Sequence, residues 1–204
     1  MTTAPESLAL LADEAASCTA CGLAEGRTQV VFGTGAPDAD VVFVLAGAGR
    51  LTDEHHVGEA PGAREDEQGV PFVGRSGQLL DRLLAEELGV ERSDVYIANV
   101  VKCRPPDNRD PRPDEIAACR PWLAHQLDLV DPVVIVTLGN FASRLLLDTA
   151  TGITKLRGAD YRYGNPPRHL VPTFHPAAAL RGGAAVLADM RSDFGRAHSL
   201  MMAA

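Results

Sequence analysis

Four apolar runs rich in Val, Ile and Leu most limit how this chain folds; they span residues 41–45, 95–101, 133–138 and 170–174. Segments with helical patterns lie around and between them, at residues 7–18, 78–88, 113–127, 141–147 and 184–197. Strands that are apolar throughout, with helices between them, are typical of a parallel sheet covered on both faces. We therefore expect an α/β fold: a three-layer α/β/α sandwich around a central, mainly parallel four-stranded sheet. Ser76 is expected to cap the helix over 78–88.

The composition predicts one domain over residues 1–204, because a chain of this length can bury a core of its own. No run of 18 apolar residues is present, so we expect no contact with a membrane. The formal charge of −8 argues against a protein that coats nucleic acid indiscriminately, which requires many phosphate contacts. No leader-like stretch precedes Cys18, so we expect a cytoplasmic protein, and no motif demands more than a monomer.

The cysteines form a second pattern, C-x2-C followed much later by C-x15-C, at Cys18, Cys21, Cys103 and Cys119. A set fully used by one such pattern indicates four thiolates that converge on a metal, either an iron–sulfur cluster or zinc. Disulfides are the alternative, but a reducing compartment disfavours them. The long separation of the two pairs favours a cluster that tethers the N-terminal segment 1–27 to the body.

Three loops that leave predicted strands carry polar motifs. In such sheets ligands bind beyond the carboxyl ends of the strands. The first loop holds GEAPG (58–62) and continues to PFVGRSGQLL (71–80). The second begins at Asn99 and runs through VVKCRPPDNRDP to residue 111, and the third is HPAAALR (175–181). An amide, an imidazole and a carboxylate flanked by glycines are therefore expected at one edge of the sheet.

Together with the cysteine spacing, these motifs resemble those of the iron–sulfur-containing family 4 uracil-DNA glycosylases. The resemblance extends from Cys18 to about Arg196. It implies a DNA-repair enzyme that hydrolyses the N-glycosidic bond of deoxyuridine in single- or double-stranded DNA. It also implies a structural 4Fe–4S cluster on the four cysteines, with zinc as the alternative.

The resemblance further implies roles for the residues that match the family motifs. Asn99 would read the polar edge of uracil, Phe72 would stack on the flipped base, and Gly58 and Ala60 would bring backbone close to it. His175 would donate a hydrogen bond to uracil O2. The plainer interpretations are a turn amide for Asn99, a core ring for Phe72 and a satisfied strand-end histidine for His175.

Other matched residues would act on the water, the sugar and the DNA backbone. Glu59 is our choice to orient water and stabilise the cationic sugar, with Glu65 as its rival. Leu180 would fill the space left by the flipped nucleotide, and Arg181 would contact phosphate. Further phosphate contacts are expected from Lys102, Arg104, Arg109 and Arg112.

The sequence departs from the family pattern in the segment 45–56, an insertion of about a dozen residues before GEAPG. If the insertion displaces the catalytic loop, the chain would be an impaired uracil-DNA-binding or damage-sensing module. A metalloprotein of electron transfer or nucleotide metabolism that shares only the fold is a third hypothesis. Residues 105–113 contain no histidine, unlike relatives that trap DNA covalently, so we expect ordinary turnover.

Overall fold

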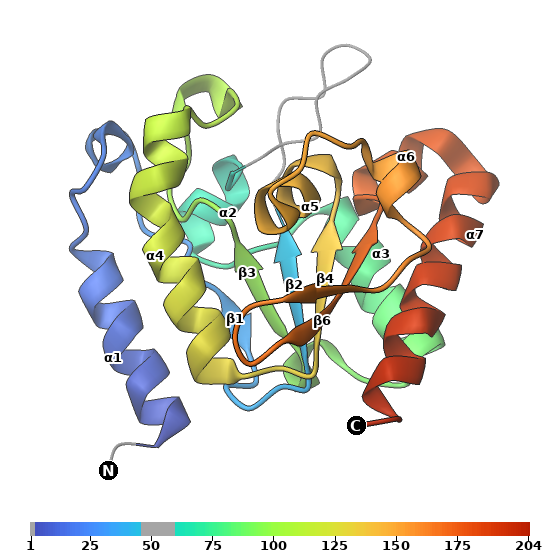
Figure 1. Ribbon diagram of the computed structural model, residues 1–204. Coiled ribbons are helices and arrows are strands. Elements are labelled where there is room, and N and C mark those ends of the chain that lie inside the picture. The colour runs from blue at the N-terminus through green and yellow to red at the C-terminus, as the bar shows by residue number, and fades with distance from the viewer. Residues whose placement is uncertain (1–2, 46–59) are drawn as a thin grey trace.

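The computed structural model describes residues 3–45 and 60–204, in which one six-stranded sheet forms the centre of the molecule (Figure 1). Its strand order is β1-β3-β2-β4-β6-β5. The four inner strands are mutually parallel and correspond to the four predicted runs: β3 (Tyr96–Asn99), β2 (Val41–Leu45), β4 (Val134–Leu138) and β6 (Arg168–Thr173). Two short antiparallel edge strands, which the sequence did not predict, complete it: β1 (Thr34–Gly35) and β5 (Tyr161–Tyr163).

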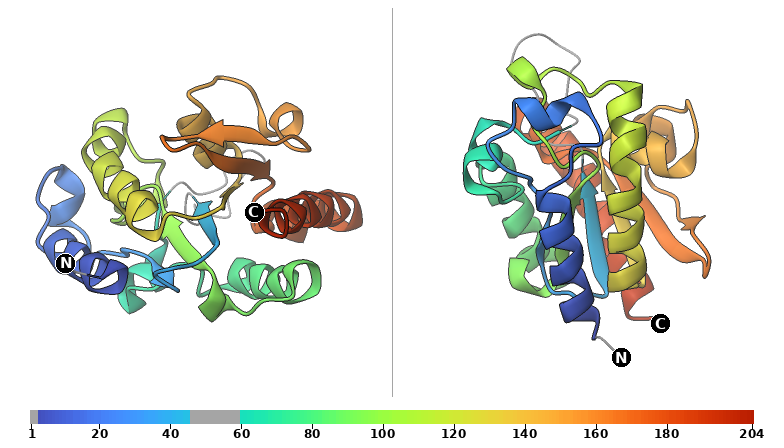
Figure 2. Two further views of the ribbon diagram at one scale, coloured as in Figure 1. Left: turned by 60° about the horizontal axis from the view of Figure 1, so that its bottom comes forward. Right: turned by 90° about the vertical axis from the view of Figure 1, so that its left-hand side faces the viewer.

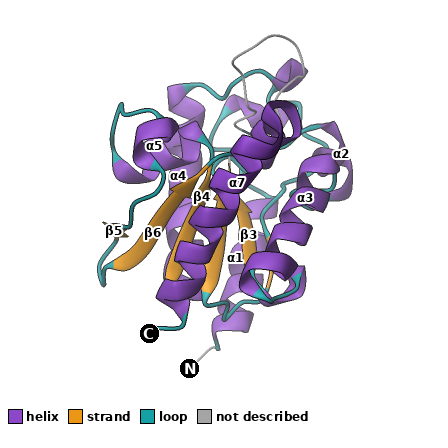
Figure 3. Cartoon of the chain, turned by 90° about the vertical axis from the view of Figure 1, so that its right-hand side faces the viewer, coloured by secondary structure: helices purple, strands orange, loops and turns teal. Residues whose placement is uncertain are grey.

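Helices cover both faces of the sheet, which confirms the three-layer sandwich (Figure 2). Side chains alternate along each strand: Val42 and Val44 join one buried cluster, whereas Val41 and Phe43 join the other. The first cluster is covered by α1 (Ala4–Ala16), α4 (Pro113–Val130) and α5 (Asn140–Leu147). The second is covered by α3 (Arg75–Leu83), the π-helical turn Leu84–Leu88 and α7 (Pro176–Met201), and Figure 3 shows α3 and α7 on this side.

Several helix boundaries differ from the predicted ones. Gly74, and not Ser76, is the N-cap of α3. The last helix begins at Pro176 and not near Ala184, and Gly183, with φ of 70°, interrupts its helical backbone. Two shorter helices lie in the loops, α2 (Ala63–Gln68) and α6 (Ile153–Leu156). In the described part of the chain, no helix is long and apolar enough to cross a membrane.

The carboxyl ends of the four inner strands form one row across the sheet. Leu45 is in register with Asn99 of β3 and with Leu138 of β4, and Leu138 is in register with Thr173 of β6. In Figure 1 this edge faces upward, and α1 begins and α7 ends at the opposite edge. The row therefore gathers the loops in which the sequence predicted the site.

Candidate base-binding site and cysteine cavity

Asn99 ends β3 with its side chain fully buried. Neither Oδ1 nor Nδ2 has a hydrogen-bond partner among the described residues. A buried amide without partners is unusual, because each unsatisfied group costs about 1–3 kcal/mol of desolvation. Such an amide is suited to receive a ligand that offers one donor and one acceptor.

His175 follows β6 and is the N-cap residue of α7. Its Nδ1 accepts a hydrogen bond of 3.1 Å from the backbone N–H of Ala177, so the neutral ring carries its proton on Nε2. Burial, and secondarily the charge of Arg181, lower the pKa of His175 to about 3. The Nε2 atom is buried and has no partner in the described part of the chain. The ring is therefore a neutral imidazole with a free Nε2–H donor.

Phe72 stacks on this imidazole. The ring centroids of Phe72 and His175 lie 5.4 Å apart with an interplanar angle of 18°. Phe72 is 6% exposed and has a φ of 57°, a backbone conformation that non-glycine residues rarely adopt and that is found at functional sites. A Cβ at Gly77 would lie 1.9 Å from the carbonyl oxygen of Phe72, so only glycine permits this approach of α3. This contact explains the second glycine of the PFVGRSG motif.

The three residues lie at one edge of the sheet. Gly139, directly after β4, packs so closely against His175 that an added Cβ would lie 3.2 Å from the histidine Cβ. His175 therefore lies over the end of β4, while Asn99 ends β3, and these two strands flank β2 about 10 Å apart. Phe72 shares a buried cluster with Leu45 and Leu138, which end β2 and β4. Two of the predicted rings are thus in contact, and the predicted amide ends β3, which is separated from β4 by β2 alone.

The predicted acid is not among these observations, because Gly58 and Glu59 lie outside the described residues, as do residues 46–56 of the insertion. The chain is described again from Ala60, which is buried at 4% exposure. Glu65 lies in the first turn of α2 and is partly exposed.

The four cysteines line one common pocket. Cys18 and Cys21 follow α1, Cys103 lies in the loop after β3, and Cys119 lies in α4. Apolar side chains complete the wall, among them Leu23, Val101 and Trp122. The N-terminal segment and the body of the chain thus meet at the four thiols.

The four thiols of this pocket are the predicted metal ligands. In the described ranges, no group of three or more His, Cys, Asp or Glu side chains is arranged to hold one metal ion. A zinc ion needs its four sulfurs about 2.3 Å away, whereas a cluster holds them at separate corners of a larger body. Sulfur also has donors here: Arg27 Nη1 lies 3.5 Å from Cys103 Sγ, and the Lys102 backbone N–H donates to Cys119 Sγ at 3.2 Å. Without a metal, burial raises the pKa of Cys103 to about 11 and also raises that of Cys119.

Lys102 contradicts its predicted role as a phosphate contact. Its side chain is 1% exposed, and its Nζ donates to the backbone oxygen of Asn99 at 2.7 Å and to Gln126 Oε1. Gln126 in turn donates to Tyr96 Oη and to the backbone oxygen of Phe32, each at 2.9 Å. Burial lowers the pKa of Lys102 to about 7. The lysine is an internal donor that holds the end of β3, and residue type alone gave no sign of this.

The other predicted DNA contacts lie at or near the surface. Leu180 is 43% exposed in the first segment of α7, and Arg181 beside it is exposed. Arg104 is partly exposed and donates to Asn108 Oδ1 at 2.7 Å. Arg109 forms two hydrogen bonds with the buried carboxylate of Glu115, at 2.6 and 2.9 Å, so part of its charge is already compensated.

Comparison with known proteins identifies the family. A family model of the uracil DNA glycosylase superfamily matches residues 55–194, so the chain belongs to this superfamily. Curated relatives then narrow the assignment to the type-4 enzymes. The chain is 44% identical over 181 residues to the type-4 uracil-DNA glycosylase of Sulfurisphaera tokodaii, which covers 86% of this chain and 76% of the relative. It is 45% identical over 184 residues to the type-4 uracil-DNA glycosylase of Thermotoga maritima, and the alignment covers 89% of this chain and 87% of that relative. A type-5 enzyme of Thermus thermophilus is 35% identical over 138 residues.

Proposed function

We propose that this chain hydrolyses the N-glycosidic bond of deoxyuridine in DNA, releasing uracil and leaving an abasic site. One structural observation supports this proposal independently of family membership. Asn99 and His175 present three buried atoms without partners in the described chain: the acceptor Oδ1 and the donors Nδ2 and Nε2. Uracil offers the complementary set, because its N3–H is a donor and its O4 and O2 are acceptors. The three unpartnered atoms thus match three polar atoms of one base.

This pattern selects uracil over cytosine. Asn99 accepts from N3–H through Oδ1 and donates to O4 through Nδ2. Cytosine has an unprotonated N3 and an amino group in place of O4. Asn99 Oδ1 would then face an acceptor and Nδ2 would face a donor, so neither hydrogen bond would form. A buried site that leaves polar groups unpaired rejects the wrong substrate strongly. Phe72 offers a ring face to the base once the nucleotide has left the stack.

His175 acts on the bond-breaking step. As the bond between N1 and the sugar breaks, the electron pair moves onto the base and negative charge develops on O2. The Nε2–H donor stabilises this charge more in the transition state than in the ground state. Because the ring is neutral, it donates a hydrogen bond without transferring a proton at the outset. Gly139 and the Ala177 N–H hold the ring in this orientation.

An acid must then assist the sugar and the water. Glu59, in the loop framed by Gly58 and Ala60, is proposed to stabilise the cationic sugar and to orient the water that attacks its C1′. Glu65 is the second candidate. Leu180 is proposed to enter the space that the flipped nucleotide leaves, and Arg181 to contact its phosphate. Arg104 and Arg109 would extend this contact.

The four cysteines are proposed to hold a 4Fe–4S cluster. When bound, this group joins the N-terminal segment 1–27 to the body and fixes the loop after β3. The apolar, thiol-lined cavity supports the proposal. Purified protein should contain iron and sulfide and absorb visible light. Stoichiometric zinc without iron would overturn the cluster assignment while leaving the base site untouched.

The catalytic proposal is tested on an oligonucleotide with a single deoxyuridine, cleaved by alkali after incubation. Wild type should produce abasic sites on single- and double-stranded DNA. Asn99→Ala, His175→Asn and Glu59→Ala should each lower the rate by about 10²-fold or more. His125→Gln, which removes an exposed imidazole, should retain the wild-type rate. Tight binding of uracil-containing DNA by wild type without abasic sites would support the impaired module instead.

A further inference from the structure

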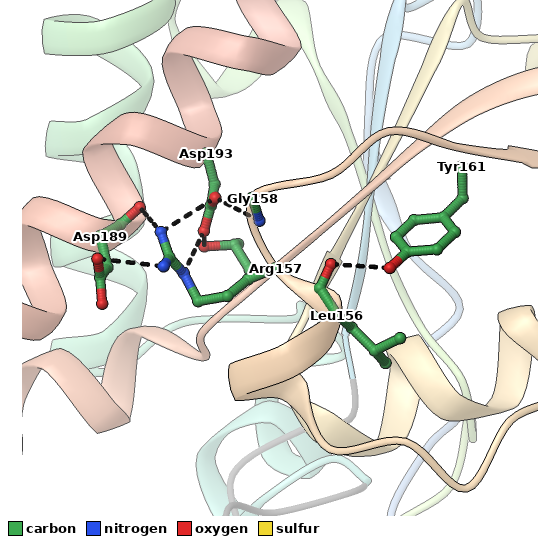
Figure 4. A network of polar contacts seen from close by, with 7 residues as sticks. Leu156, Arg157, Gly158, Tyr161, Asp189 and Asp193 are labelled. Carbon is green, nitrogen blue, oxygen red and sulfur yellow. Dashed lines mark hydrogen bonds and ion pairs between the residues drawn. The ribbon is translucent and has the colours of Figure 1, made fainter.

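A buried carboxylate on α7 has no part in the chemistry proposed above. Asp193 is fully buried, and its two oxygens accept four hydrogen bonds. Figure 4 shows its contacts with Arg157 and Gly158. Oδ2 accepts from Thr173 Oγ1 at 2.8 Å and from Arg157 Nε at 3.0 Å. Oδ1 accepts from Arg157 Nη2 at 3.2 Å and from the Gly158 N–H at 3.1 Å. One carboxylate thus joins the end of β6, the segment after α6 and the middle of α7.

Arg157 extends this network over the residue that precedes His175. Its Nη2 donates to the backbone oxygen of Asp189 at 2.8 Å, and its Nη1 lies 3.1 Å from Asp189 Oδ1. Its guanidinium also lies over the ring of Phe174, 5.5 Å from the centroid. Phe174 is therefore held between the guanidinium and the protein interior. Residues 173 and 174, the two immediately before His175, are both fixed by the same group of side chains.

The other contacts of His175 depend on the position of this strand end. The backbone oxygen of Thr173 accepts a hydrogen bond of 2.8 Å from the Gly139 N–H, which sets the approach of β6 to the glycine that packs against His175. On the far side, the helical backbone of α7 is interrupted at Gly183, so the first segment of α7 is not rigidly continuous with the part that bears Asp193. The Asp193 network is thus a direct link from the body of α7 to the strand that carries the histidine.

We infer that Arg157, Asp193 and Thr173 form a positioning clamp, which aims the Nε2–H of His175 at the departing base. This inference rests on the role proposed for His175. The placement of the ion pair supports this inference: a buried charged pair seldom adds more stability than apolar packing would, and this one joins β6, the segment after α6 and α7 in one fixed arrangement. The position of a catalytic donor strongly affects the reaction rate, since a displacement of about 1 Å lowers the rate by about 10²-fold.

The chain offers a matched control at the opposite end of the same strand. Arg168 begins β6 and is 7% exposed. Like Arg157 it binds two aspartates, Asp131 at 2.9 Å and Asp128 at 3.3 Å. A clamp at that end stabilises the fold but is remote from the carboxyl edge. Arg157→Met and Arg168→Met each remove a largely buried guanidinium that pairs with two aspartates; the aspartates of Arg168 are more exposed, and only Arg157 is linked to His175.

The experiment measures the single-turnover rate of uracil release, the affinity for substrate DNA and the urea midpoint. Thr173→Val removes one hydroxyl without changing the shape of the side chain, and it should lower the rate about tenfold or more at unchanged DNA affinity. Thr173→Ser keeps the donor and should restore the rate. Arg157→Met should lower both rate and midpoint, whereas Arg168→Met should lower the midpoint alone.

A double-mutant cycle with His175→Asn separates a positioning role from a structural one. If the clamp acts through the imidazole, Thr173→Val should change the residual rate of His175→Asn by less than about twofold. Multiplicative losses, an unchanged rate in Thr173→Val, or equal rate losses in Arg157→Met and Arg168→Met would overturn the clamp. Inactivity of wild type would instead refute the proposed function, so the two failures are distinguishable.

Discussion

Lowering the pH should destabilise this protein through one identified group, His175. The imidazole is 2% exposed, and burial together with the charge of Arg181 lowers its pKa from 6.5 to about 3. Because the folded-state pKa is depressed, the unfolded chain takes up the proton first as the pH falls. The contribution of His175 to stability is therefore complete above pH 6.5 and is lost progressively as the pH falls toward 3.

The size of the effect follows from the shift. Each pH unit between the two pKa values changes the free energy of unfolding by about 1.36 kcal/mol for one group. At pH 4.5, two units below the ordinary pKa of 6.5, the loss from His175 is about 2.7 kcal/mol. This is a large share of the stability of an ordinary domain.

Urea titrations at pH 7 and pH 4.5 measure this loss when wild type is compared with His175→Asn. Asparagine is a good N-cap residue whose Oδ1 can replace Nδ1 as the acceptor for the Ala177 N–H, and it does not titrate. Wild type should lose about 2.7 kcal/mol more than His175→Asn between the two pH values. His125→Gln, at an exposed position, should behave like wild type. Equal losses in wild type and His175→Asn would refute a buried neutral imidazole.

Three further substitutions test other parts of the structure. Asn99→Ala removes two unsatisfied buried groups, so it should leave the urea midpoint at or above that of wild type while uracil release falls; a loss above about 1 kcal/mol would indicate a structural amide. Lys102→Met leaves the Asn99 carbonyl and Gln126 without a donor and should lower the free energy of unfolding by about 2–3 kcal/mol. The control Lys155→Met, at an exposed position, should lower it by less than about 0.5 kcal/mol. Equal urea midpoints for the two variants would contradict the buried network. Leu180→Ala should slow uracil release about tenfold from duplex DNA and little from single strands. Leu10→Ala, at an exposed position of α1, is the control. Equal slowing on both substrates would exclude a role for Leu180 in filling the space of the flipped nucleotide.

Sequence patterns were sufficient for the layers of the fold but not for its edges. The four inner strands lie in continuous apolar runs, so their composition reveals them. The edge strands have two and three residues, too few for any periodicity. The early start of α7 was missed because Gly182 and Gly183 argue against a helix there, whereas Pro176 begins one directly after His175.

The candidate site was likewise predictable from the sequence only in part. Asn99, Phe72 and His175 could be found because they belong to motifs at strand ends. The burial of Lys102 could not, because it depends on carbonyl and amide partners from β3 and α4 that meet only in the folded chain. The Asp193 clamp is hidden for the same reason: Arg157 and Asp193 are 36 residues apart, and neither lies in a recognisable motif.

The most direct measurement is a crystal structure of the protein with uracil bound. Asn99 Oδ1, Asn99 Nδ2 and His175 Nε2 should each lie about 3 Å from a polar atom of the base, at N3, O4 and O2 respectively, with Phe72 against its face. Uracil bound elsewhere, or a base in this place with the Asn99 amide and the His175 Nε2 still unpartnered, would contradict the proposed recognition.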